Sequence, residues 1–188
     1  MGRLMDKSRQ DRLILKLLNR ALNAANEEKV LILLNRMIER QNKSHVALQS
    51  GLNRTTLYRG FSPNNSPKLE TVLKVMDAFA MQLQCSGRNS SPTDCARMTA
   101  ELLNKAFATN NLEVISRAIG EAVHAQANIA EFARRVSISR MSLYRWIQAG
   151  NALHFRSVLK ITSALALGLE VAWRSSSTDV ERHSGRSS

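Results

Sequence analysis

The sequence predicts an all-α fold of two tandem five-helix units, because it contains a long internal repeat, helical apolar spacing and almost no strand signals. Residues 52–84 return at 138–170 without a gap, with 11 identities in 33 positions at an offset of 86. Upstream the match continues at an offset of 85, where residues 18–21 meet 103–106. A period of this length indicates a duplicated domain, since solenoid repeats are much shorter.

The first unit is expected to contain five helices. They cover residues 9–24, 27–40, 44–50, 53–61 and 68–84. Glu27 and Glu28 place acidic residues in the first turn of the second helix, which is typical of a helix start. The segment 62–67 contains two prolines and two asparagines, so it is predicted to be a loop that separates the last two helices.

The second unit is expected to repeat this order, with helices over 92–108, 111–126, 128–135, 139–148 and 154–173. Ser91, Pro92 and Asp94 resemble an N-cap, a proline at the first helical position and an acidic third residue. The predicted domains are therefore 1–84 and 92–173, joined by a polar linker at 85–91 and followed by a Ser-rich, disordered tail at 174–188.

Two short helices in the middle of the first unit are predicted to form a helix-turn-helix. Gly51 can adopt the positive φ that a sharp turn between helices commonly requires. Val46, Ala47, Ser50, Leu52, Leu57 and Phe61 form the expected inward side. Asn53 is the expected cap of the second helix, and Arg54, Thr55, Tyr58 and Arg59 fall on its opposite, polar side.

The second unit repeats this arrangement with a bend at Val136 and Ser137. Its inward side is predicted to hold Phe132, Ala133, Ile138, Leu143 and Trp146, and its outward side Ser139, Arg140, Met141, Tyr144 and Arg145. One copy alone also fits an ordinary helix pair with a solvated basic face. Both copies, however, keep Arg, Tyr and Arg on the side that packing does not need, which favours a binding face.

The two outward faces suit the major groove of DNA. An arginine fork matches the two acceptors of guanine, and a helix start capped by Asn53 or Ser139 can hold a phosphate. Thr55 and Met141 are expected to point at bases, whereas phosphate contact and packing against the groove wall both stay open for the two tyrosines. The predicted DNA-binding residues are Asn53, Arg54, Thr55, Tyr58, Arg59, Ser139, Arg140, Met141, Tyr144 and Arg145.

The composition supports a polyanionic partner. The 188 residues carry a net charge of +12 and the pI is about 10.7, although charge alone also fits RNA or an anionic membrane surface. No apolar run long enough to span a bilayer and no signal segment is present, so a cytoplasmic, nucleoid-associated protein is expected.

Catalytic and metal-binding patterns do not stand out in the sequence. It shows no nucleophile–base grouping, Gly-rich phosphate loop or carboxylate pair, so we expect no enzyme activity, no cofactor and no metal. Cys85 and Cys95 are expected to be reduced thiols, with a redox clip across the linker as the alternative.

Residues 51–59, followed by Ser62-Pro63 and by 71–75, resemble the addiction-module antidote family of lambda-repressor-like proteins. The resemblance covers residues 12–84, and the second unit shows it more loosely, without the Ser-Pro loop. It implies an all-helical DNA-binding domain that represses its own operon and neutralises a small ribonuclease toxin of the RelE type. A fused pair departs from the family, whose usual members are single units.

Two functions stay open at this point. The first is a sequence-specific transcriptional repressor whose units read two similar half-sites of double-stranded DNA. The alternative is an antitoxin that binds a RelE-type toxin and autoregulates its operon, and a non-specific nucleic-acid coat protein is a third hypothesis. The chain is expected to act as a pseudo-dimeric monomer or a homodimer. We expect its units to pack through the helices ending at Gln84 and Trp173, the alternative being two independent beads.

Overall fold

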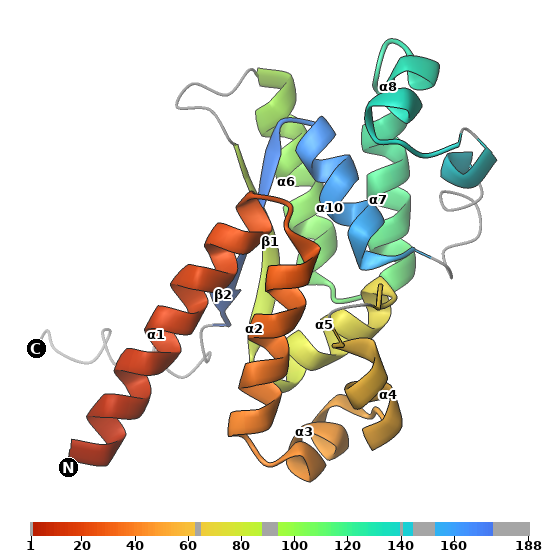
Figure 1. Cartoon of the computed structure of the whole chain (residues 1–188). Coiled ribbons are helices and arrows are strands. Elements are labelled where there is room, and N and C mark those ends of the chain that lie inside the picture. The colour runs from red at the N-terminus through yellow and green to blue at the C-terminus, as the bar shows by residue number, and fades with distance from the viewer. Residues whose placement is uncertain (1, 63–64, 88–93, 140, 145–152, 175–188) are drawn as a thin grey trace, which may run out of the picture.

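The computed structural model describes residues 2–62, 65–87, 94–139, 141–144 and 153–174, with side chains from Gln10 onward. In the described part of the first unit, five helices precede one strand (Figure 1). They are α1 (Gly2–Asn23), α2 (Glu27–Arg40), α3 (Lys43–Ser50), α4 (Arg54–Gly60), α5 (Leu69–Ala78) and the strand β1 (Met81–Gly87).

The second unit repeats this order in its described part. Its elements are α6 (Asp94–Ala108), α7 (Leu112–His124), α8 (Ile129–Arg135), α10 (Phe155–Ala164) and the strand β2 (Leu167–Trp173). Residues 141–144 are helical, whereas the remainder of the helix expected over 139–148 lies largely outside the described residues. The same holds for 88–91 of the expected linker and for the expected tail beyond Arg174.

The prediction of an all-α fold is wrong. The described residues form one two-stranded antiparallel sheet, to which each half contributes a strand, with a register from Met81↔Trp173 to Gly87↔Leu167. β2 and residues 81–84 of β1 occupy the segments expected as the ends of the helices 154–173 and 68–84. Residues 85–87 of β1 were expected to belong to the linker. From Met81 onward the apolar residues recur at every second position, which is the period of a strand.

A left-handed residue separates each of these helices from its strand. Ala80 has φ 53° and Ala166 has φ 59°, and the two alanines are repeat equivalents at the offset of 86. Glycine is the usual residue in this conformation, so the sequence contained none of the ordinary signal for a helix end here. The predicted helices 68–84 and 154–173 are therefore too long, because α5 ends at Ala78 and α10 ends at Ala164.

The two halves are related by a pseudo-two-fold axis that passes through the sheet. Gln84 pairs with Glu170, its own repeat equivalent, as a two-fold axis between the strands requires. A second pairing on the same axis joins Lys68 and His154, which are also repeat equivalents. It is flanked by hydrogen bonds of 2.8 Å from Leu69 N to Leu153 O and 2.9 Å from Phe155 N to Pro67 O.

Each strand is covered by the first helix of the other half. α1 packs on β2, and α6 packs on β1. The Asn19 side chain donates to Val171 O (3.1 Å) and accepts from Val171 N (2.8 Å). Its equivalent Asn104 donates to Cys85 O (3.0 Å) and accepts from Cys85 N (2.5 Å). The halves therefore exchange helices across the sheet, and they pair through strands where the sequence predicted helices.

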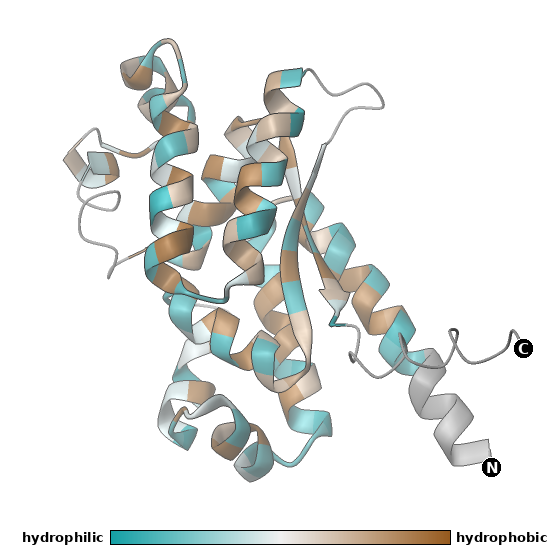
Figure 2. Ribbon diagram, turned by 180° about the vertical axis from the view of Figure 1, so that it is seen from behind, coloured by the Kyte–Doolittle hydropathy of each residue, from teal (hydrophilic) through white to brown (hydrophobic). Residues whose placement is uncertain are grey.

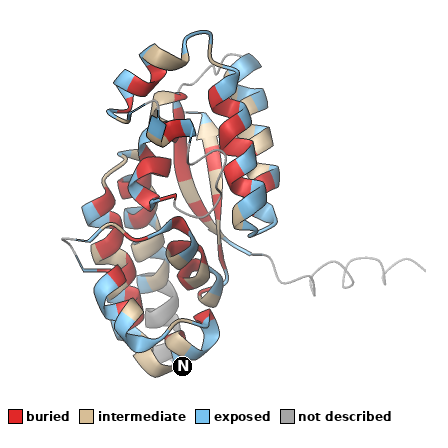
Figure 3. Ribbon diagram, turned by 90° about the vertical axis from the view of Figure 1, so that its right-hand side faces the viewer, coloured by how far each residue is buried: buried red, intermediate tan, exposed pale blue. Residues whose placement is uncertain are grey.

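The strands are the centre of a shared hydrophobic core. Met81, Leu83 and Cys85 on β1 and Leu167, Leu169 and Val171 on β2 are all buried. Apolar residues gather on the helix sides that face the strands (Figure 2), and buried residues surround the sheet (Figure 3). Burial of this common core stabilises the association of the two halves.

Candidate nucleic-acid interface

The helices α3 and α4 are joined by a short turn whose conformation is set by two local signals. Gly51 lies in the left-handed region at φ 64°, as expected from its place in the sequence, and its amide bonds back to Leu48 O (3.3 Å). Asn53 then caps α4, since its side-chain Oδ1 accepts from Thr56 N at 2.7 Å. These contacts fix the direction in which α4 leaves the turn.

The inward and outward sides of this helix pair agree with the sequence pattern. Val46, Leu57 and Phe61 are buried against the core, whereas Ala47 and Leu52 are half-buried. The predicted binding residues Asn53, Arg54, Thr55, Tyr58 and Arg59 are all exposed. The helix α4 therefore presents a polar face with two arginines to solvent, and its contact with DNA stays a prediction.

Lys43 is a further residue at this face that the sequence reasoning missed. Its ammonium lies 4.3 Å from the ring centroid of Tyr58, a cation–π contact that restrains the tyrosine and adds a positive charge beside α4. Lys43 begins α3, one residue before the helix start expected at Ser44. A hollow next to α4 is lined by polar and basic side chains, among them Asn53, Thr55, Arg59, Lys68 and Thr71.

The second unit builds the corresponding turn with different residues. Ser137, the equivalent of Gly51, also has a positive φ of 53°. Ser139 Oγ accepts from Ser142 N at 3.0 Å, which caps the helical residues that follow. Ser139, Met141 and Tyr144 are exposed and Leu143 is buried. The other expected residues of this segment, Arg140, Arg145 and Trp146, lie outside the described residues.

The two candidate faces differ in the neighbour of their tyrosine. Tyr144 has its ring centroid 6.0 Å from that of His124, while Tyr58 lies under the ammonium of Lys43. Met141, which is 72% exposed, occupies the place of Thr55. The faces therefore share the tyrosine but offer different surroundings to a ligand.

The helical segments that carry the two candidate faces lie on the same side of the molecule. α4 and the helical residues 141–144 are on the right in Figure 1 and on the left after the 180° turn of Figure 2. The pseudo-two-fold axis runs between them. One ligand surface could therefore meet both helices at once.

Metal ligands, membrane spans and thiols were searched for among the residues that the structure describes. No group of three potential metal ligands occurs among them, and no helix in this part of the chain is long and apolar enough to cross a membrane. Both cysteines are free thiols, and Cys95 is exposed whereas Cys85 is buried. Burial raises the pKa of Cys85 to about 12, which keeps it a neutral thiol.

Comparison with known proteins gives the family. A family model described as "Probable addiction module antidote protein" matches residues 4–87 and again 90–173. An uncharacterized protein of Haemophilus influenzae strain Rd is 36% identical over 67 residues, which cover 36% of this chain and 69% of that protein. No solved structure matches the chain. The resemblance seen in residues 51–59 is thereby confirmed, and the chain belongs to the addiction module antidote family as a tandem duplication of its unit.

Proposed function

We propose that the chain is the antidote of an addiction module: it binds a small toxin protein of the RelE type directly and represses its own operon. The observation that carries this proposal is the match of both halves to the antidote family, over residues 4–87 and 90–173. The proposed activity is binding and not catalysis, and its place of action is the cytoplasm.

Neutralisation is tested by the growth of cells that express a reading frame found next to the gene of this chain. Induction of that frame alone should arrest growth, and co-expression of this chain should restore it. A co-purified complex of the two proteins would support direct binding. If the chain neither restores growth nor co-purifies with the product of a neighbouring frame that does arrest growth, the antidote role is wrong.

We propose DNA binding as the activity by which the chain represses its operon. The exposed residues of α4 and the exposed Ser139, Met141 and Tyr144 support it, because the two helical segments that carry them lie on one side of the molecule. Arginine pairs with the acceptors of guanine, and a net charge of +12 attracts a polyanion. Each unit would read one of two similar half-sites.

A gel-shift titration of the promoter region of its own operon tests this second activity. The promoter fragment should be bound in the presence of excess unrelated DNA, and a scrambled fragment of equal length should not. Equal affinity for both fragments would favour the non-specific coat protein. Specific binding without any toxin partner would favour a stand-alone repressor.

A further inference from the structure

The contacts across the pseudo-two-fold axis are not the same on its two sides. On one side Asn23 of α1 lies against Gly168 of β2, where a Cβ would overlap Asn23 Oδ1 and lie 3.0 Å from its Cγ. The Asn23 side chain is held there by a 3.2 Å hydrogen bond from its Nδ2 to Glu170 Oε1. This position of β2 therefore accommodates Asn23 because it has no side chain.

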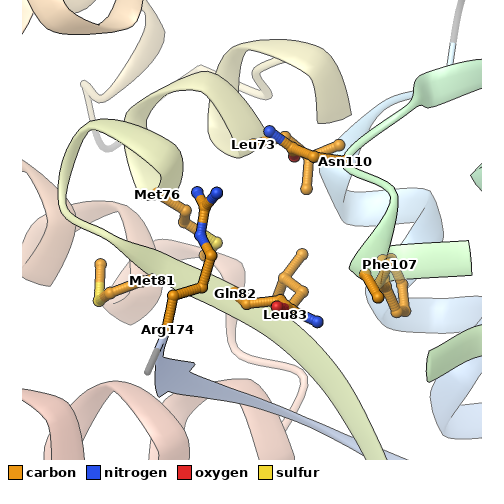
Figure 4. A pocket seen from close by; sticks show the side chains of 9 residues that line it. Leu73, Met76, Met81, Gln82, Leu83, Phe107, Asn110 and Arg174 are labelled. Atoms are coloured by element: carbon orange, nitrogen blue, oxygen red, sulfur yellow. The ribbon is translucent and has the colours of Figure 1, made fainter. Parts of the chain in front are cut away.

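On the other side of the axis, the large and the small residue have exchanged places between helix and strand. The repeat equivalents of Asn23 and Gly168 are Ala108 at the end of α6 and Gln82 on β1. Both line one hollow, of which Figure 4 labels Gln82, so here the helix carries the small residue and the strand carries the large one. Each side pairs one large side chain with one small residue.

A second position pair is asymmetric in charge. Glu27 at the start of α2 is 8% exposed, and its carboxylate accepts hydrogen bonds from Ser66 Oγ (2.9 Å) and from Arg156 Nε of α10 (2.5 Å). The equivalents of Glu27 and Arg156 are Leu112 and Glu70, and Glu70 forms an ion pair with Lys74 (2.7 Å). The buried carboxylate is thus paired with a cation on one side, whereas Leu112 on the other side has no charge with which to form such a pair.

We propose that these two position pairs make the first unit (residues 2–87) a specific partner of the second (94–174) and exclude pairing between identical units. Two first units would bring Asn23 against Gln82 and Glu27 against Glu70. Two second units would bring Ala108 against Gly168, leaving a gap, and Leu112 against Arg156. They would also place two Glu170 carboxylates opposite each other on the axis, where like charges destabilise a strand pair.

The partner that this surface fits is therefore a unit of the same family with the complementary residues. A glycine at the position of Gly168 and a cation at the position of Arg156 define it for the first unit. The duplicated chain would accordingly reject single units of related antidotes that lack both features. This specificity does not depend on whether the chain binds DNA or a toxin.

Full-chain variants can recreate in place the two combinations that a pair of first units would form. Gly168→Gln sets a glutamine against Asn23, as two first units would, and should lower the urea midpoint of unfolding clearly. Adding Asn23→Ala recreates the Ala108–Gln82 pair of the other side and should recover at least half of that drop. An equal drop for Gly168→Gln in the wild-type and Asn23→Ala backgrounds would overturn the proposal.

The charged pair provides a second cycle of variants, at Arg156, whose side chain is 57% exposed. Arg156→Glu should lower the urea midpoint in the presence of Glu27 and much less in the Glu27→Leu background, which recreates the Leu112–Glu70 pair. Lys160→Glu, the same charge change one turn later on α10, should leave the midpoint nearly unchanged. If Arg156→Glu costs as much in the Glu27→Leu background as in the wild type, or no more than Lys160→Glu does, the proposal is wrong.

Discussion

Asn65 shows how one repeated residue serves the candidate face without belonging to it. Its side-chain Nδ2 donates to Arg59 O at 2.6 Å and so binds a carbonyl at the last turn of α4. Such carbonyls lack a partner within the helix, which makes the bond stabilising. Asn65 is one of the identities of the repeat, with Asn151 as its equivalent. Asn65 therefore has a structural role at the end of α4, whereas the exposed side chain of Arg59 is free for the predicted contact with DNA.

Arg59→Ala should weaken binding to the operator by about 1 to 3 kcal/mol, because the side chain is exposed and its fork can pair with guanine or phosphate. The far-ultraviolet circular dichroism and the melting temperature should stay as in the wild type. Arg36→Ala, an exposed arginine on α2 outside the helix-turn-helix, is the matched control and should bind normally. Unchanged affinity of Arg59→Ala in a gel-shift titration would show that the face is misassigned.

Cys85 should make stability depend on alkaline pH. Burial raises its pKa from 9.0 to about 12, so above pH 9 the unfolded chain loses a proton that the folded chain retains. The free energy of unfolding should then fall between pH 9 and 12, by up to about 1.4 kcal/mol per pH unit from this group. The decline in urea titrations should be shallower in Cys85→Ala. Equal pH dependence in the two proteins would contradict the assignment.

At the scale of elements, the sequence predicted the helices better than the strands. α2 begins and ends at Glu27 and Arg40 as expected, since its acidic first turn and apolar spacing both point to a helix. The turn at Gly51 was predictable because glycine is the usual residue at positive φ. The strands were missed because Ala80 and Ala166 end their helices in that conformation without a glycine.

The candidate site could be predicted only as far as local spacing determines it. The exposure of Arg54, Thr55, Tyr58 and Arg59 follows from helical periodicity. The contact of Lys43 with Tyr58 could not be predicted, because it depends on how α3 crosses α4. The exchange of α1 and α6 between the halves is likewise a tertiary feature, which no pattern within one unit encodes.

Ala80→Gly should stabilise the protein slightly, since the left-handed conformation costs an alanine about 1 kcal/mol and costs glycine almost nothing. The greater freedom of glycine in the unfolded chain offsets part of this gain, so the net increase should be about 0.5 kcal/mol or less. Gly51→Ala, at another left-handed position, should instead lower the melting temperature. Calorimetry that finds Ala80→Gly clearly destabilising would contradict the assigned conformation.

Asn19→Ala should weaken the packing of α1 on β2. The change removes both hydrogen bonds to the Val171 backbone and leaves a partly buried N–H and C=O without these partners, at a cost of about 2 kcal/mol. Asn104→Ala should cost a similar amount at the equivalent place on β1. Asn35→Ala, whose side chain bonds only within α2, should have little effect in urea titrations. A loss of stability in only one of the two variants, Asn19→Ala or Asn104→Ala, would argue against the pseudo-two-fold pairing.

At the scale of the whole molecule, the chain combines two antidote units around one sheet. The strands pair at the equivalent residues Gln84 and Glu170, and the first helix of each unit packs on the strand of the other unit. Joining two binding units in one chain replaces a concentration-dependent association by an intramolecular one. The two candidate faces are thus held on one side of the molecule without the need for a second chain.

We expect one chain to act as a complete pair of antidote units. Because the faces are related by a pseudo-two-fold axis, the operator should contain two similar half-sites in inverted orientation. Light scattering of the complex between the protein and a bound operator fragment measures the number of chains directly. We expect the mass of one chain per inverted repeat. A mass of two chains per operator, with each chain covering a single half-site, would contradict it.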